Sequence, residues 1–174
     1  MPTLEHINAA LRRIPNYPKE GIEFIDITTM ISNADHFNTV LDFVVDYYKD
    51  KGITKVVGVE SRGFIFGGAL ASRLNAGFVP IRKPGKLPAE TYSVSYDLEY
   101  GQDSIFIHKD ALEEGDVVLL HDDLLATGGT TRASLELLEN FKLKETFINF
   151  IIELEGLKGR DTLADYDVMS VIKN

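Results

Sequence analysis

Apolar residues along this chain follow two alternating patterns, helical spacing and short continuous runs. Helical spacing, as in Val40, Leu41 and Val44, predicts amphipathic helices. These helices are expected at 3–13, 35–50, 64–74 and 131–140. The continuous runs are too short for helices and suit buried strands of a parallel sheet, which is covered on both faces. These strands are expected at 54–59, 77–81, 117–120, 146–152 and, at the sheet edge, 167–172.

Two segments fall outside this alternation. Pro18 and Gly21 break the first helix, and 22–27 alternates weakly as a short strand or extended segment. Residues 91–95 and 104–108 are rich in strand formers on either side of 97–103, which predicts a hairpin-like excursion suited to a mobile lid. We therefore expect one α/β domain over 1–174, with a mostly parallel central sheet flanked by helices. Within it, 1–34 forms a small N-terminal unit and 35–174 the core.

Composition narrows the functional classes. The chain has 174 residues, 44% of them hydrophobic and 26% charged, as in ordinary soluble globular domains. No apolar run approaches the ~20 residues of a membrane span, and no signal-peptide pattern is present, so we expect a cytoplasmic protein without a membrane partner. Eighteen basic and 27 acidic residues give a net charge of −9, which argues against non-specific nucleic-acid binding. There is no cysteine, and the four histidines lack metal-ligand spacing.

The stretch after the run 117–120 carries the strongest chemical signal. It ends in small and hydroxylated residues: Ala126, Thr127, Gly128, Gly129 and Thr130. Because 131–140 is expected to be helical, this loop would lie at a helix N-terminus, where unpaired N–H groups and the helix dipole favour an anion. The two threonines would add hydroxyl donors. The pattern predicts a site for a phosphate monoester.

Asp122 and Asp123 precede this loop, where the strand is expected to leave the sheet. Their carboxylates would repel a phosphate that touched them. They suit a ligand that needs acceptors, such as vicinal ribose hydroxyls or a magnesium ion with its water shell. The stretch as a whole predicts a site for a sugar diol with a 5′-phosphate, although the acidic pair alone could be a solvated turn.

Cations follow two other strand ends. Arg62 and Gly63 come after 54–59, at the edge where open α/β sheets bind ligands, so the arginine can engage a second anion. Arg82, Lys83 and Lys86 fall within five positions after 77–81. Such a loop can be a solvated turn, but its place at a third strand end favours an anion clamp.

Residues 122–130, Asp-Asp-Leu-Leu-Ala-Thr-Gly-Gly-Thr, resemble the phosphoribosyl-pyrophosphate (PRPP) signature of the type I phosphoribosyltransferase family. Glu-Ser-Arg-Gly-Phe at 60–64 resembles the family's pyrophosphate loop. Arg-Lys-Pro-Gly-Lys-Leu-Pro at 82–88 and Leu-Glu-Tyr-Gly at 98–101 resemble segments of its adenine-specific branch. The resemblance runs from about Tyr17 to Arg160. His121 departs from it, replacing a branched aliphatic, and so does Ile25, replacing Arg or Lys.

The resemblance implies a role for each segment. The segment 1–34 would be a hood that closes over the base, with main-chain groups of Phe24 and Ile25 binding the adenine edge. Glu99 would be the catalytic carboxylate that reaches the base, beside Tyr100 in the lid, and a cis peptide is expected at 60–61. Pyrophosphate is assigned to Ser61, Arg62, Arg82, Lys83 and Lys86. Ribose 5-phosphate is assigned to Asp122, Asp123, Ala126, Thr127, Gly128, Gly129 and Thr130, of which both aspartates also count as catalytic.

The activity implied by the resemblance is transfer of the 5-phosphoribosyl group from PRPP to adenine, giving AMP and pyrophosphate. Mg²⁺ would be held mainly by PRPP and waters, with no direct protein ligand expected. A homodimer is implied because cations of the 82–86 loop can serve a neighbouring subunit in that family. Two alternatives remain open: transfer to guanine, hypoxanthine or xanthine, and a PRPP-binding regulator without turnover.

Overall fold

The computed structural model describes residues 2–17, 20–21, 23–98 and 101–174. Within these residues the central sheet has five parallel strands in the order β4–β3–β7–β8–β9. The strands are β3 (Lys55–Val59), β4 (Gly77–Ile81), β7 (Val117–Leu125), β8 (Glu145–Glu153) and β9 (Val168–Lys173). This confirms the predicted parallel sheet and places the last strand at its edge.

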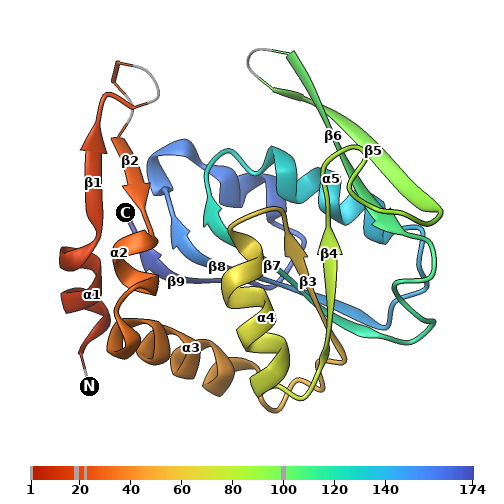
Figure 1. Cartoon of the computed structure of the whole chain (residues 1–174), viewed down its shortest axis with the longest axis horizontal. Coiled ribbons are helices and arrows are strands. Elements are labelled where there is room, and N and C mark those ends of the chain that lie inside the picture. The colour runs from red at the N-terminus through yellow and green to blue at the C-terminus, as the bar shows by residue number, and fades with distance from the viewer. Residues whose placement is uncertain (1, 18–19, 22, 99–100) are drawn as a thin grey trace.

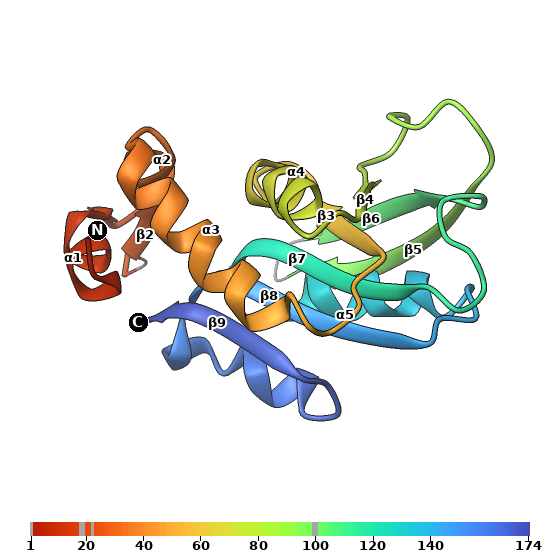
Figure 2. The same cartoon turned by 90° about the horizontal axis from the view of Figure 1, so that it is seen from below.

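Helices cover both faces of the sheet, as Figures 1 and 2 show. On one face lie α3 (Ala34–Tyr48) and α4 (Gly63–Arg73), and on the other α5 (Gly129–Leu138) with the 3₁₀ helix η2 (Gly159–Leu163). A second 3₁₀ helix, η1, spans Glu155–Leu157. Successive strand residues point to opposite faces, so Val56 packs in the α3–α4 core and Val57 in the α5 core. This two-sided burial accounts for the continuous apolar runs within the strands, such as Val117–Leu120 in β7.

The N-terminal unit contains α1 (Leu4–Ala10), β1 (Arg12–Pro15), β2 (Glu23–Asp26) and α2 (Thr28–Ile31). The predicted helix 3–13 was wrong at its C-terminal end, because residues 12 and 13 belong to β1. That strand pairs antiparallel with β2, and ion pairs Arg12–Asp26 (3.2 Å) and Arg13–Glu23 (2.9 Å) join the two. Pairing with a distant segment overrides the local helical spacing here.

The predicted hairpin is present as β5 (Thr91–Leu98) and β6 (Gly101–His108). Its strands extend further than the sequence indicated, since Tyr96 pairs with Asp103 inside the expected connection. The hairpin packs against α5 mainly through β5, and Ile105 and Ile107 of β6 lie in the same core as α5. Among the described helices none is long and apolar enough to cross a membrane.

Strand β7 continues through the acidic pair, which corrects the expectation that the strand ends before it. Pairing with β3 stops at His121, but pairing with β8 continues from Asp122 to Leu125. Asp122 and Asp123 therefore lie on a strand extension bounded by β8 alone. Helix α5 also begins at Gly129, two residues earlier than predicted.

Candidate active site

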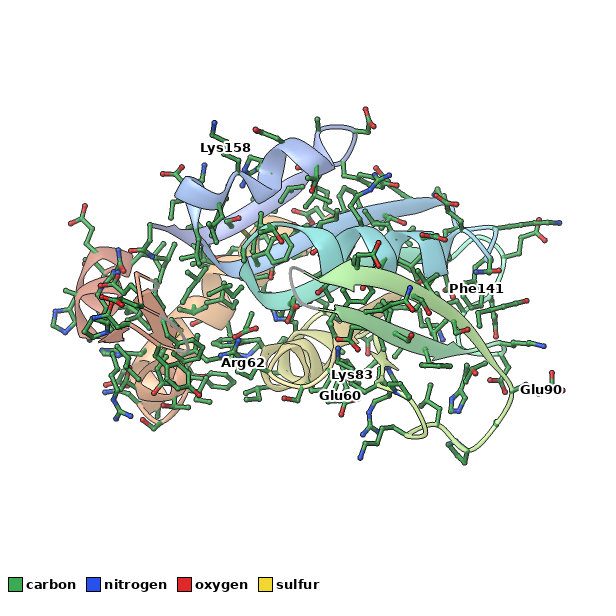
Figure 3. All side chains as sticks on the ribbon, turned by 90° about the horizontal axis from the view of Figure 1, so that it is seen from above. Glu60, Arg62, Lys83, Glu90, Phe141 and Lys158 are labelled. Carbon is green, nitrogen blue, oxygen red and sulfur yellow. The ribbon has the colours of Figure 1, made fainter. Side chains whose placement is uncertain are left out.

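The ends of β3, β4 and β7 meet at the carboxyl edge of the sheet, as parallel strands require. In Figure 1 the β1–β2 hairpin and the β5–β6 hairpin extend beyond this edge on either side. Figure 3 views the molecule from above this edge. Arg62 lies on the side of α4 that faces the N-terminal unit, and Glu60 and Lys83 lie on the side that faces the β5–β6 hairpin. The fold thus gathers the three segments that the sequence singled out at one edge.

The loop 126–130 follows β7 and forms the N-terminus of α5. Gly128 occupies the N-cap position with a φ of +85°, a conformation that favours glycine, and no described side chain caps the helix. The first N–H groups of an α-helix have no partner within the helix, so they are available to an anion. A cavity of about 80 Å³ lies here, lined by Asp122, Leu124, Leu125, Ala126, Thr127, Gly128, Gly129, Thr130 and Thr131.

A segment that the sequence left without a role supports this loop from behind. A Cβ on Gly128 would lie 2.9 Å from the Gly159 carbonyl oxygen, and one on Gly159 would collide with the Ala126 carbonyl oxygen. Arg160 fixes that segment by donating to both carboxylate oxygens of Glu153, at 2.9 and 2.6 Å. Only glycine at positions 128 and 159 permits this close approach of the two segments. Nothing in the local sequence around either glycine identifies the other segment as its neighbour.

Asp123 of the acidic pair is shielded from solvent, while Asp122 is half-buried and lines the cavity. Asp123 is 3% exposed, and its backbone N–H donates to Oδ1 of Asp122 at 2.8 Å. Burial, and secondly the neighbouring Asp123 carboxylate, raise the pKa of Asp122 well above its usual range. Burial also raises the pKa of Asp123, although the Arg62 guanidinium opposes this rise. Ligands that supply hydrogen-bond donors or positive charge would stabilise both ionised carboxylates.

Arg62 joins the acidic pair to the N-terminal unit. Its Nε lies 3.0 Å from Oδ2 of Asp123, and its guanidinium carbon lies 5.4 Å from the centre of the Phe24 ring. Phe24 therefore faces the site. The neighbouring Ile25 is 2% exposed and packs in the α3–α4 core, so its side chain points away from the site. The aliphatic residue at this position completes the core.

Two cations of the 82–86 loop, Arg82 and Lys83, have carboxylate partners in the structure. Arg82 donates through Nε to Glu60 at 2.9 Å, and the Lys83 backbone N–H donates to the same carboxylate at 2.7 Å. These hydrogen bonds lower the pKa of Glu60. The Lys83 ammonium pairs with Asp103 on β6, while Lys86 is exposed. Sequence reasoning missed Glu60 and Asp103 as partners because acidic residues are common in this chain.

Three further predictions concern the 60–61 peptide bond, Glu99 and Tyr100. The peptide bond between Glu60 and Ser61 is cis, as predicted, and Ser61 is exposed. Glu99 and Tyr100 lie outside the described residues.

His121 is fully buried beneath the acidic pair. Its Nδ1 lies 2.8 Å from Oδ1 of Asn149, its partner residue on β8, and Asn149 donates to the Met169 carbonyl at 3.2 Å. Nε2 of His121 has no partner among the described residues. Burial lowers the pKa of His121 to about 4, so the ring is neutral at physiological pH. His121, which stands where the family pattern has a branched aliphatic residue, therefore makes a polar contact with Asn149 in the core.

Fold and site together define a class of protein. The sheet edge carries a helix N-terminus without a described side-chain cap, an acidic pair and a cationic loop, and residues 29–173 match the family model of the phosphoribosyl transferase domain. An adenine phosphoribosyltransferase from Phocaeicola vulgatus is 61% identical over 156 residues, which cover 90% of each chain. The chain therefore belongs to the adenine phosphoribosyltransferase family.

Solved structures agree with this assignment. The adenine phosphoribosyltransferase of Thermoanaerobacter pseudethanolicus is 49% identical, with a TM-score of 0.94 over 99% of this chain and 100% of that one. The enzyme from Giardia lamblia, solved with 9-deazaadenine, is 42% identical, with a TM-score of 0.95 over 100% of this chain and 99% of that one. The relatives match in length as well as in fold.

Proposed function

We propose that this chain transfers the 5-phosphoribosyl group of PRPP to adenine, giving AMP and pyrophosphate. One observation carries the proposal: the acidic pair near the end of β7 precedes a helix N-terminus with no described capping side chain, and Arg62 lies 3.0 Å from Asp123. Adenine is the proposed base because a relative 61% identical is an adenine phosphoribosyltransferase and the Giardia enzyme was solved with an adenine analogue. Hood and core would act as one catalytic domain, since Ile25 shares a core with α3.

The substrate would lie across the edge from α5 towards the N-terminal unit. Ala126, Thr127, Gly128, Gly129 and Thr130 would hold the 5′-phosphate. Asp122 and Asp123 would accept hydrogen bonds from the ribose hydroxyls. In an oxocarbenium-like transition state the same carboxylates would stabilise the positive charge that develops on the sugar. Their burial strengthens this effect because the surroundings screen charge weakly.

Pyrophosphate would bind at Ser61, Arg62, Arg82, Lys83 and Lys86. In the structure Arg62, Arg82 and Lys83 pair with carboxylates, so pyrophosphate would replace or share those partners. The pairs support the proposal because they hold the cations at the sheet edge. These cations would stabilise the negative charge on the leaving group.

The base would lie between the N-terminal unit and α4. Main-chain groups of Phe24 and Ile25 would bind the adenine edge, and the Phe24 ring supports this because it faces Arg62. Glu99 would fix the reactive tautomer of adenine from the lid, beside Tyr100. Closure of the lid would exclude water that could hydrolyse the activated sugar.

Mg²⁺ fits the residues at this edge. It typically binds proteins through one or two carboxylates and completes its shell with waters and substrate phosphates. Asp122 and Asp123 would face the water shell of the ion without binding it directly, and their raised pKa values favour a cationic neighbour. The ion would be held mainly by PRPP and waters, and when bound it would neutralise charge on pyrophosphate.

A homodimer is supported by an apolar surface beside the cationic loop. Ile65 and Phe78 are 41% and 37% exposed, on α4 and on the edge strand β4. Phe64 packs edge-on against Phe78 at 5.7 Å, and Arg82 lies over the Phe64 ring. A second subunit covering this surface would lie next to the 82–86 loop. Sedimentation of the wild-type chain and an Ile65→Glu/Phe78→Glu variant tests this, and a monomeric wild type would refute it.

The activity is tested by incubating the protein with PRPP, Mg²⁺ and each purine base in turn, and measuring pyrophosphate. We expect release with adenine and little with guanine, hypoxanthine or xanthine. Preference for another base would replace adenine in the proposal. PRPP binding without turnover on any base would identify a regulator.

A further inference from the structure

The Tyr96 hydroxyl connects the two segments proposed to bind the opposite ends of PRPP. Thr130, in the loop at the start of α5, donates through Oγ1 to Oη of Tyr96 at 3.2 Å. Tyr96 in turn donates to Oδ2 of Asp103 at 3.3 Å, and the same oxygen pairs with the Lys83 ammonium. A tyrosine hydroxyl can accept one hydrogen bond and donate another, so the chain Thr130–Tyr96–Asp103–Lys83 is chemically consistent.

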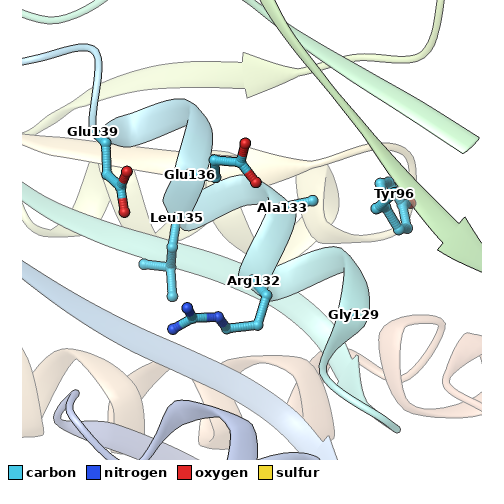
Figure 4. A pocket seen from close by; sticks show the side chains of 7 residues that line it. All are labelled: Tyr96, Gly129, Arg132, Ala133, Leu135, Glu136 and Glu139. Carbon is cyan, nitrogen blue, oxygen red and sulfur yellow. The ribbon is translucent and has the colours of Figure 1, made fainter.

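The hairpin geometry places both central members of this chain on one face. Tyr96 and Asp103 are direct cross-strand partners in the β5–β6 ladder, so their side chains lie side by side. Figure 4 shows Tyr96 facing the first turns of α5, where it lines a cavity of about 460 Å³ with Gly129 and Arg132. The Lys83 ammonium lies 6.0 Å from the centre of the Tyr96 ring. The hairpin is thus attached to the 82–86 loop on one side and to α5 on the other.

This chain of hydrogen bonds can couple the binding of pyrophosphate at Lys83 to the binding of the 5′-phosphate at Thr130. A pyrophosphate that draws Lys83 away leaves Asp103 with Tyr96 as its remaining side-chain partner among the described residues. The Tyr96 O–H then becomes the stronger donor to a carboxylate that has lost its cation. The Tyr96 oxygen also accepts the hydrogen bond from Thr130. The position of the Thr130 hydroxyl therefore depends on whether Lys83 is paired with Asp103 or with pyrophosphate. Each ligand acts on one end of a shared set of contacts.

We propose that Tyr96, held by Asp103, is a positioning residue that couples the binding of pyrophosphate to the binding of the 5′-phosphate. The inference rests on the proposed function and extends it, since the proposed roles of Lys83 and Thr130 do not require them to communicate. By linkage the effect is reciprocal, and each ligand changes the affinity for the other by the same factor. Couplings between sites typically amount to roughly fivefold or more.

The test uses ribose 5-phosphate and pyrophosphate as separate probes for the two ends of PRPP. Calorimetric titration of ribose 5-phosphate, with Mg²⁺ and with or without saturating pyrophosphate, gives the coupling factor directly. We expect roughly fivefold or greater coupling in the wild type. Tyr96→Phe, which removes one oxygen and keeps the ring, should reduce the factor to about one. Asp103→Asn, which removes the charge that attracts Lys83, should do the same.

Tyr92→Phe is the matched control. Tyr92 lies on the same strand, four residues before Tyr96, and its ring packs against Phe141 at 5.6 Å. Its variant should keep the wild-type coupling. Unchanged coupling in Tyr96→Phe and Asp103→Asn would overturn the inference, as would a wild type that binds both probes independently. If the wild type bound neither probe and made no AMP, the proposed function itself would fail.

Discussion

Arg62 and Asp123 form an ion pair, with Nε 3.0 Å from Oδ2, although Asp123 follows Arg62 by sixty-one positions in the sequence. The contact lacks the alignment of a hydrogen bond, since Oδ2 of Asp123 has no hydrogen-bond partner among the described residues. Asp123 thus has a nearby cation, while half-buried Asp122 lies beside a second carboxylate. The two aspartates should therefore respond differently to substitution.

Asp122→Asn should stabilise the protein while lowering its activity. The pKa of Asp122 is raised in the folded state, so stability falls as pH rises through the interval between its unfolded and folded pKa values. An amide of the same shape removes that loss at neutral pH. We expect a higher urea midpoint for Asp122→Asn at pH 7.5, no gain near pH 4, and AMP formation reduced by at least ~tenfold.

Asp123→Asn provides the comparison, because it also leaves Arg62 without its partner. Its midpoint should rise less than that of Asp122→Asn, with a similar loss of PRPP binding. A lower midpoint for Asp122→Asn than for the wild type, or unaffected kinetics in both variants, would contradict this account of the pair.

His121 should make stability depend on pH between about 6.5 and 4. The folded protein keeps the ring neutral down to about pH 4, whereas the unfolded chain takes up the proton near pH 6.5. Stability is therefore lost as pH falls through this window, by up to roughly 3 kcal/mol. Urea unfolding of the ligand-free protein at pH 7.5, 5.5 and 4.5 measures the slope.

His121→Val/Asn149→Val is the variant for this test, because replacing His121 alone would leave Oδ1 of Asn149 without its partner. The double variant should lose part of the acid destabilisation seen in the wild type. Equal slopes for the two proteins would show that another group is responsible.

Gly159→Ala should weaken PRPP binding although Gly159 is not among the proposed ligand-binding residues. The new methyl group would meet the Ala126 carbonyl oxygen and lie 2.9 Å from Cδ1 of Leu125, which displaces the phosphate loop. We expect a several-fold increase in the KM for PRPP and destabilisation of ~1–3 kcal/mol.

Gly156→Ala is the matched control for that substitution. Gly156 lies three residues earlier, and a Cβ there would meet no atom within 4 Å. It should leave both KM and stability close to wild type. If both alanine variants raised KM equally, the contact between residue 159 and the loop would not be the cause.

Glu99→Leu should lower kcat by ~tenfold or more with little change in the KM for PRPP, because the proposed role of Glu99 concerns the base. Glu90→Leu, at the start of the hairpin, serves as control: Glu90 is exposed and pairs with Lys109. Steady-state kinetics with PRPP and adenine varied separately distinguish the two effects. Near-normal turnover in Glu99→Leu would remove this residue from the mechanism.

Much of this architecture follows from local sequence pattern. Continuous apolar runs predict strands covered on both faces, and Val56 and Val57 do pack in opposite cores. The small residues at 126–130 predict an anion loop before a helix, and Gly128 takes the left-handed conformation at the start of α5. The assignment of adenine required the resemblance of the 82–88 and 98–101 segments, since no spacing or composition identifies a base.

Contacts between distant segments were decided only by the tertiary structure. Packing against β8 extends β7 through Asp122, and pairing with β2 converts residues 12 and 13 from helix to strand. The hydrogen bond from Thr130 to Tyr96 and the close approach of Gly159 to Ala126 leave no trace in either local sequence. The spacing of apolar residues predicts which face of a helix or strand is buried, because it is read within that one element. Which polar side chains meet depends on how the elements pack, and this is set by the whole core at once.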